Sequence, residues 1–151
     1  MEIERKFLIN QLPDNLNSYK KKELEQGYLN TDPVVRIRKS DQSYELTYKS
    51  AGLMSREEYN LPINEKSYLH LKEKCDGLII SKTRYLIPID NQLVIELDIF
   101  HHDLSPLILA EVEFPDEETA CNFVPPLWFG KDVTFDGRYH NNYLSKTSNK
   151  V

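Results

Sequence analysis

Charged residues alternate with apolar residues along many short segments of this 151-residue chain, and within one segment the charges often share a sign. In a β-strand, residues two apart project from the same face. Glu2 and Glu4 therefore share a face if the first segment is a strand, as do Arg36 and Arg38 in a later one. The pattern predicts a sheet with one strongly ionic face.

The like-signed pairs extend over most of the chain. They are Glu2 with Glu4, Glu96 with Asp98, Glu111 with Glu113, Arg36 with Arg38, and Lys82 with Arg84. Like charges on one strand face repel each other, so each pair implies an opposite charge nearby. A bound polyanion together with divalent cations would supply both kinds of counter-charge.

Eight extended segments are predicted from alternation and turn residues. They cover residues 2–9, 20–30, 34–39, 44–49, 56–63, 78–88, 92–100 and 107–114. Helices are expected at residues 65–75 after an Asn64 cap, from Asp116 through Phe123, and at residues 139–146. Hairpin-scale connections or single helices join the segments, which favours antiparallel pairing. The predicted fold class is mainly β (α+β), an eight-stranded antiparallel β-barrel or tunnel with a few covering helices.

Two arrangements of such a barrel are open. In the first, the apolar phase fills the interior and the charges face solvent. In the second, the charges line a hydrated interior, since unpaired ions in a dry core are costly, and the opposite phase is covered by helices. That opposite phase includes Ile37, Tyr59 and Val112. Segregation of signs by strand favours the second arrangement, as do oxygen ligands suited to Mg²⁺ or Mn²⁺ and cations suited to phosphate.

Composition narrows the possible partners. The length fits one domain, expected to span residues 1–151, and 40% hydrophobic residues suffice for a core. A net charge of −5 disfavours nucleic acid and anionic membranes as partners. No apolar run approaches the roughly 18 residues of a membrane span, so we expect a cytoplasmic protein. The five glycines are not clustered, which disfavours P-loop and Rossmann nucleotide sites.

Cysteines, histidines and one aromatic pair lie outside the charged pattern. Cys75 and Cys121 lack metal-type spacing and are expected to be small buried hydrophobes. The histidines, expected to be solvated, are His70, His101, His102 and His140. Trp128 and Phe129 follow two prolines and either close a tunnel mouth or dock the C-terminal segment on the barrel; docking is favoured.

The run Glu2-Ile-Glu-Arg-Lys6 resembles the N-terminal Glu-x-Glu-x-Lys signature of the CYTH superfamily, the triphosphate tunnel metalloenzymes. The resemblance continues in order and approximate spacing through residues 26–29, 36–38, 46–49, 55–59, 82–85, 96–98, 104–107, 111–114 and 125–130. It implies an eight-stranded tunnel whose lumen binds a triphosphate with divalent metal. It also implies the short bacterial branch, whose members often hydrolyse inorganic tripolyphosphate and, to varying degrees, nucleoside triphosphates.

The same resemblance implies roles for individual residues. The implied metal ligands are Glu2, Glu4, Glu58, Glu96, Asp98, Glu111 and Glu113. Glu96 and Asp98 are either ligands or hydrogen-bond acceptors behind them. The implied phosphate-binding cations are Lys6, Arg36, Arg38, Lys49, Arg56, Lys82 and Arg84. Arg56 and Glu58 equally fit an ion pair that stiffens the wall. The expected cofactor is Mg²⁺ or Mn²⁺, with two ions.

The expected reaction is phosphoryl transfer to water, in which in-line positioning and charge neutralisation supply the rate. The candidate general bases are Lys82, if neighbouring arginines depress its pKa, and Tyr28, which equally fits a wall residue that orders water. The leading hypothesis is metal-dependent hydrolysis of inorganic tripolyphosphate, a small-molecule partner. The alternatives are a class IV-type adenylate cyclase, a thiamine or nucleoside triphosphatase, and a non-catalytic polyphosphate- or nucleotide-binding module. The sequence leaves a homodimer open.

Overall fold

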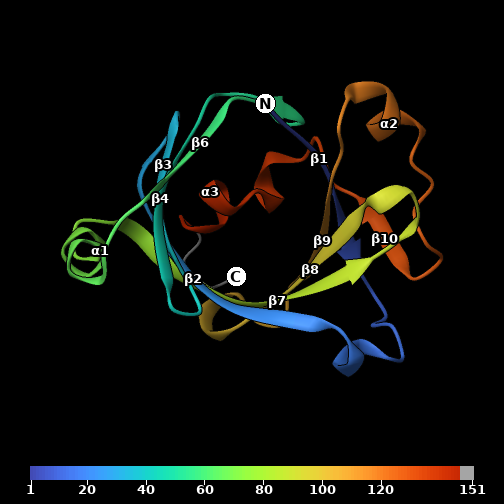
Figure 1. Cartoon of the computed structure of the whole chain (residues 1–151), viewed down its shortest axis with the longest axis horizontal. Coiled ribbons are helices and arrows are strands. Elements are labelled where there is room, and N and C mark those ends of the chain that lie inside the picture. The colour runs from blue at the N-terminus through green and yellow to red at the C-terminus, as the bar shows by residue number, and fades with distance from the viewer. Residues whose placement is uncertain (147–151) are drawn as a thin grey trace.

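The structure is a computed structural model that describes residues 1–146. Within that range, ten antiparallel strands form one sheet that curls into a nearly closed barrel (Figure 1). The strands are β1 (Glu2–Ile9), β2 (Lys20–Thr31), β3 (Val34–Ser40), β4 (Ser43–Lys49), β5 (Ser55–Arg56), β6 (Glu58–Pro62), β7 (Asp76–Pro88), β8 (Val94–Phe100), β9 (Ile108–Glu113) and β10 (Phe129–Asp132). Their order is β10-β1-β9-β8-β7-β2-β3-β4-β6. The short strand β5 lies off this path and pairs with the start of β1.

The predicted antiparallel barrel is confirmed, and each of the eight predicted extended segments contains a strand. The expected number of strands is too low by two. The two additional strands are β5, of two residues, and β10, of four residues. Neither is long enough to show a period-two alternation, so pattern alone could not separate them from loops.

Two of the three α-helices among residues 1–146 lie outside the barrel (Figure 1). They are α1 (Glu65–Lys72) and α2 (Glu117–Asn122). Asn64 and Asp116 cap them, each side chain accepting a hydrogen bond from a backbone N–H three residues on. The α1 helix ends three residues before the predicted boundary, which is a common uncertainty at frayed helix ends. No helix of the described chain has the length and apolarity that a membrane span needs.

The third helix, α3 (Asn141–Leu144), lies inside the ring of strands (Figure 1). The expected covering helices are therefore found in α1 and α2, whereas α3 is not one of them. Leu144 packs in a buried cluster with Tyr28, Val34, Phe100 and Leu109, whose strands surround it. One end of the interior is thus apolar. Short 3₁₀ turns complete the helical structure at Leu16–Ser18, Asp90–Gln92, His102–Leu104 and Gly137–Tyr139.

The main hydrophobic core lies on the outer face of the barrel. Ile95, Leu97 and Val112 are fully buried there, beneath α2 and the segment that follows it. Trp128 and Phe129 pack against this core, which confirms docking of the C-terminal segment. The outer face is not covered everywhere, because Tyr48 and Tyr59 on β4 and β6 remain exposed. The expected complete cover is wrong at those two strands.

Several expectations about cysteine and histidine are also corrected. Cys75 is only half-buried, and Cys121 is exposed, since it lies on the solvent side of the short helix α2. His140 is buried rather than solvated, and its Nε2 lies 2.9 Å from the carbonyl oxygen of Thr134. His101 is half-buried, with its Nε2 2.8 Å from the hydroxyl of Thr83.

Candidate active site

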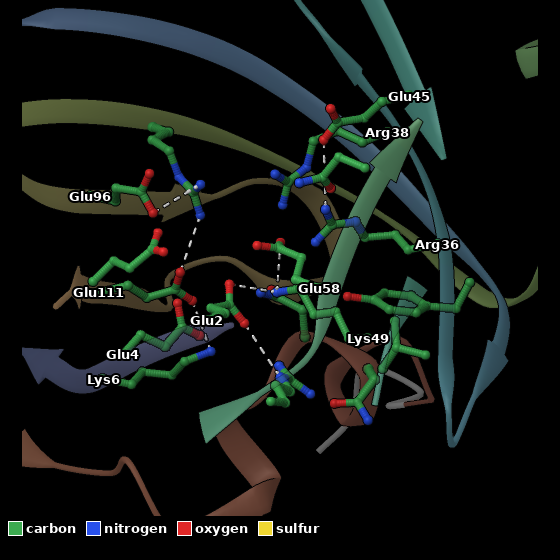
Figure 2. A pocket seen from close by; sticks show the side chains of 18 residues that line it. Glu2, Glu4, Lys6, Arg36, Arg38, Glu45, Lys49, Glu58, Glu96 and Glu111 are labelled. Atoms are coloured by element: carbon green, nitrogen blue, oxygen red, sulfur yellow. Dashed lines mark hydrogen bonds and ion pairs between the residues drawn. The ribbon is translucent and has the colours of Figure 1, made fainter. Parts of the chain in front are cut away.

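A cavity of about 210 Å³ occupies the interior of the barrel beside α3, and 18 residues line it (Figure 2). Six of the lining side chains are cations: Lys6, Arg36, Arg38, Lys49, Arg56 and Arg84. Seven are carboxylates: Glu2, Glu4, Glu45, Glu58, Glu96, Glu111 and Glu113. The others are Tyr28, Val34, Asn60, Asn141 and Asn142. We call this space the charged cavity.

Strand alternation and register explain how these residues meet. On β1, Glu2, Glu4 and Lys6 point into the barrel, whereas Arg5 points out and pairs with Asp132 at 2.8 Å. The antiparallel pairing of β1 with β9 sets Glu4 opposite Glu113 and Lys6 opposite Glu111. The inward orientation of the charged phase, the second of the two arrangements predicted above, is therefore confirmed.

Thirteen of the fifteen predicted site residues line the charged cavity; these are Glu2, Glu4, Lys6, Tyr28, Arg36, Arg38, Lys49, Arg56, Glu58, Arg84, Glu96, Glu111 and Glu113. Most are buried in the wall, whereas Glu113 is exposed at its edge. Their individual roles stay predictions, because placement in the lining does not distinguish a metal ligand from a phosphate contact or an ion pair.

The other two predicted residues, Lys82 and Asp98, are fully buried and do not line the cavity. Their Nζ and Oδ2 atoms are 2.7 Å apart. Asp98 also accepts two hydrogen bonds from Arg84, from Nε at 2.7 Å and from Nη2 at 2.8 Å. Burial lowers the pKa of Lys82 to about 7, with Asp98 opposing and Arg84 adding to the shift. Burial, more than the neighbouring arginines, lowers this pKa, and the position behind the cavity wall favours a role in holding Arg84; the general-base role of Lys82 stays a prediction.

Ion pairs join most of the cavity wall. Lys6 lies 2.8 Å from Glu111, and Lys49 lies 3.0 Å from Glu2 (Figure 2). Arg84 reaches Glu96 at 3.2 Å and Glu111 at 3.4 Å. Although burial acts to raise it, Lys6 and Arg84 hold the pKa of Glu111 well below its usual range. These pairs keep both partners charged in a site that is largely removed from water.

Glu4 differs from its neighbours. It is buried, and among residues 1–146 its carboxylate forms no ion pair and no side-chain hydrogen bond. Burial, with Glu111 and Glu2 close by, raises the pKa of Glu4 to about 8. A buried carboxylate between two others lacks a positive partner, and a bound cation would supply one.

Arg38 is held in place by a neutral side chain rather than by a carboxylate. Its Nε and Nη2 donate to Oε1 of Gln26 at 2.9 and 2.7 Å. The amide nitrogen of Gln26 donates in turn to the hydroxyl of Tyr28 at 3.2 Å. Within the described chain Arg38 forms no ion pair, so its charge remains available to an anion in the cavity.

Sequence reasoning missed five lining residues. Glu45 and Asn60 have the phase of Lys49 and Glu58 on β4 and β6, so strict alternation would have found them. Val34 is the apolar start of β3 and carries no chemical signal. Asn141 and Asn142 belong to α3, and no periodicity in a four-residue helix predicts that it enters a barrel.

The lining offers ligands for a divalent metal ion. The carboxylate oxygens supply the donors that Mg²⁺ and Mn²⁺ prefer. Glu4, without a cation partner and flanked by Glu2 and Glu111, gives such an ion a place where its charge is needed. In residues 1–146 no three His, Cys, Asp or Glu side chains are already gathered as a ligand group. The donor chemistry therefore fits, and two opposing carboxylates, Glu4 and Glu113, form no ion pair within residues 1–146 and would be available to hold the metal.

Comparison with known proteins places this arrangement in a family. The CYTH domain model matches residues 1–135. The chain is 43% identical over 148 residues to an inorganic triphosphatase of Nitrosomonas europaea, covering 95% of this chain and 96% of that protein. It is 36% identical over 155 residues to an inorganic triphosphatase of Acetivibrio thermocellus, covering 99% and 96%.

Solved structures give the same result. The crystal structure of an inorganic triphosphatase superposes with a TM-score of 0.75 at 38% identity, covering 99% of this chain and 97% of that one. A Hippeastrum protein described as a putative adenylyl cyclase with dominant triphosphatase activity shares the fold, with a TM-score of 0.64 at 19% identity over 80% and 83%. With the family model, the close relatives and the charged barrel in agreement, this chain belongs to the CYTH domain family.

Proposed function

We propose that this protein hydrolyses inorganic tripolyphosphate in the charged cavity, with the help of Mg²⁺ or Mn²⁺. The observation that carries the proposal is the lining itself, in which six cations and seven carboxylates point into one small interior space. An apolar or singly charged ligand would leave these groups uncompensated, whereas a polyanion that arrives with metal ions satisfies both signs. The close relatives named inorganic triphosphatases support the choice of substrate.

The cations are the groups that would hold the phosphates. Arg36 and Arg38 extend from one strand, and Arg84 faces them from β7. A guanidinium presents several N–H donors in a plane and matches pairs of phosphate oxygens. Arg38 is the strongest candidate for direct contact, because Gln26 orients its fork and leaves its charge unpaired.

Enzymes of this family are metal-dependent in general. In this chain Glu4 would be the main ligand, with Glu2, Glu111 and Glu113 as the nearest further carboxylates. Glu58 and Glu96 are the remaining predicted metal ligands that line the cavity. Bound there, two ions of Mg²⁺ or Mn²⁺ would neutralise charge on the phosphate oxygens.

The reaction transfers a terminal phosphoryl group to water. A water oxygen forms a bond to the terminal phosphorus while the bond from that phosphorus to the bridging oxygen breaks. One proton of the water stays on the new phosphate and the other passes to the leaving pyrophosphate oxygen or to solvent, so the products are phosphate and pyrophosphate. Arg36, Arg38 and Arg84 would fix the phosphates in line and stabilise the charge of the transition state. The hydroxyl of Tyr28 accepts from Gln26 and keeps its own proton for the substrate or the attacking water. Lys82 would act at a distance, since it and Arg84 share Asp98.

The test is a comparison of substrates with purified protein. Tripolyphosphate, ATP and thiamine triphosphate are each incubated with Mg²⁺, with Mn²⁺, or with EDTA, while phosphate release and cyclic AMP are measured. We expect the highest kcat/KM with tripolyphosphate and none with EDTA. Cyclic AMP from ATP would establish a cyclase instead, and tight binding without phosphate release from any substrate would establish a binding module.

A further inference from the structure

A second cavity, of about 270 Å³, adjoins the charged cavity at the end of the barrel formed by the β3–β4 hairpin. Its lining residues are Lys22, Leu24, Arg38, Ser40, Ser43, Tyr44, Glu45 and Arg84. Arg38, Glu45 and Arg84 line both cavities, so the two spaces meet along these side chains. Figure 2 shows Arg38 and Glu45 together at one end of the charged cavity. We call the second cavity the rim.

The inward-facing residues of β3 give the order of the spaces along the barrel. Arg36 lines the charged cavity alone, Arg38 lines both spaces, and Ser40 lines the rim alone. Alternate residues of a strand are about 7 Å apart. The rim therefore continues the path of the arginines by about one such step toward the hairpin, on the side away from α3.

The rim carries an excess of positive charge. Lys22 on β2 lies directly opposite Arg84 on β7, and like charges in this position repel. Arg38 is the third cation, and Glu45 is the one carboxylate in the lining. Arg84 is already paired with Asp98, Glu96 and Glu111, so the uncompensated charge belongs to Lys22 and Arg38. Within residues 1–146 neither Lys22 nor Arg38 forms an ion pair, whereas Glu45 lies 3.8 Å from Arg36. An anion at the rim would relieve this repulsion.

The remaining rim residues favour phosphate over a nucleoside. Ser40 and Ser43 face each other across the hairpin and bring two hydroxyl groups to the rim. Among the rim residues only Tyr44 is aromatic, and its ring packs against Tyr68 of α1 with a centroid distance of 5.2 Å. A base usually needs a free aromatic face for stacking. Hydroxyls and an ammonium group instead match phosphate oxygens.

The cavity at the opposite end of the barrel is a poorer candidate. It adjoins the charged cavity at Val34, Arg56 and Asn142. Of these three, Arg56 is the charged one, and its Nε already lies 3.4 Å from Glu2. The one further cation in the lining of that cavity, Lys146, shares it with the carboxylate of Asp32. On the hairpin side, in contrast, both Lys22 and Arg38 lack an ion-pair partner within residues 1–146, so a phosphate chain that outgrows the charged cavity finds more uncompensated positive charge there.

We propose that the rim binds the phosphate groups beyond the third in a linear polyphosphate, with Lys22 as the cation that contacts the fourth. The protein then accepts tetrapolyphosphate and longer chains as well as tripolyphosphate. This inference rests on the proposed function, because it places the first three phosphates in the charged cavity.

The test compares tetrapolyphosphate with tripolyphosphate in Lys22→Ala and in a matched control, Lys21→Ala. Lys21 is also exposed on β2 and differs in facing the outside of the barrel. Both kcat/KM with metal and calorimetric binding of each polyphosphate are measured. We expect Lys22→Ala to lower the ratio of tetrapolyphosphate to tripolyphosphate kcat/KM about tenfold, mainly through KM. Lys21→Ala should leave the ratio within about twofold, because Lys21 faces away from the rim and acts on a bound phosphate only through screened, long-range electrostatics.

Each other outcome has a definite meaning. An equal effect of Lys22→Ala on both polyphosphates, or no effect on either, would overturn the proposal that the rim binds the fourth phosphate. So would a wild-type protein that binds tripolyphosphate but not tetrapolyphosphate. If the wild type hydrolyses neither, the proposed function fails. The calorimetric ratio still reports on the rim in that case, because Lys22 must favour the longer chain if the rim binds its fourth phosphate.

Discussion

Replacement of Asp98 by alanine is the most informative perturbation of the cavity wall. Asp98 is fully buried and bears the only negative charge that contacts both Lys82 and Arg84 among residues 1–146. Asp98→Ala would deprive both buried cations of this negative charge. Removal of one partner from a buried ion pair costs about 3–5 kcal/mol. Against a total stability of about 5–15 kcal/mol for a domain, this is a large fraction.

The best control is Glu96→Ala. Glu96 lies on the same strand, two residues away, and pairs with the same guanidinium at 3.2 Å. Its side chain is 36% exposed, so solvent screens the pair and its loss should cost about 1 kcal/mol or less. The difference between the two variants compares the loss of a buried carboxylate that holds two cations with the loss of a screened one that holds a single cation.

The penalty should also depend on pH through Lys82. Burial lowers the pKa of Lys82 to about 7 even though Asp98 acts to raise it. Without Asp98 that pKa falls further, so near pH 8.5 the amine is neutral and less costly to bury. The loss of stability in Asp98→Ala should therefore shrink between pH 6 and pH 8.5.

Urea denaturation of the wild type and both variants measures these differences. We expect Asp98→Ala to lose about 3–5 kcal/mol at pH 6, which corresponds to a fall in Tm of roughly 10 °C or more, and Glu96→Ala to lose about 1 kcal/mol or less. Equal losses in the two variants would refute the reasoning, since it attributes the cost to burial of the charges rather than to the loss of an ion pair.

Three further variants test the cavity. Glu4→Gln should reduce metal-dependent tripolyphosphate hydrolysis by roughly 100-fold or more, and a variant that keeps its turnover would remove Glu4 from the metal site. The same variant should be more stable by roughly 3 kcal/mol at pH 7, because burial raises the pKa of Glu4 to about 8 and folding of the wild type must therefore protonate this carboxylate. Arg38→Ala should raise KM about tenfold in the same assay, a smaller loss because other cations remain; an unchanged KM would exclude phosphate contact. Burial lowers the pKa of His140 to about 4, so the wild type loses stability below about pH 6.5, where the unfolded chain takes up a proton that the folded chain does not. In urea denaturation, the stability of His140→Gln minus that of the wild type should be about 2 kcal/mol greater at pH 5 than at pH 7.5, and an equal difference at the two pH values would contradict the shift.

Alternation of charge was enough to predict most of the architecture and of the site. The phase of Glu2 and Glu4 on β1, and of Arg36 and Arg38 on β3, determines which side chains enter the barrel. The same alternation does not show whether an inward-pointing side chain reaches the cavity or stays buried behind its wall. Lys82 and Asp98 have the inward phase too, but a second layer of packing, with Lys82 5.1 Å from the ring of Phe100, removes them from the cavity.

Features without period-two alternation escaped prediction. The entry of α3 into the barrel depends on Leu144 packing with Phe100 and Leu109, contacts between residues far apart in the chain. The burial of His140 follows from the same segment. The cytoplasmic location, a single domain through residue 151 and a homodimer remain predictions, and residues 147–151 lie outside the described part of the chain.

The central claim is that the interior of the barrel binds a triphosphate between arginines and metal-holding carboxylates. A crystal structure of the protein grown with Mg²⁺ and tripolyphosphate tests it most directly, with the Glu4→Gln variant, which is expected to turn over slowly, as an alternative. The account predicts phosphate oxygens within hydrogen-bonding distance of Arg36 and Arg38 and, in the wild type, a metal ion at Glu4. Tripolyphosphate bound on the outer surface, with Arg38 and Glu4 untouched, would contradict it.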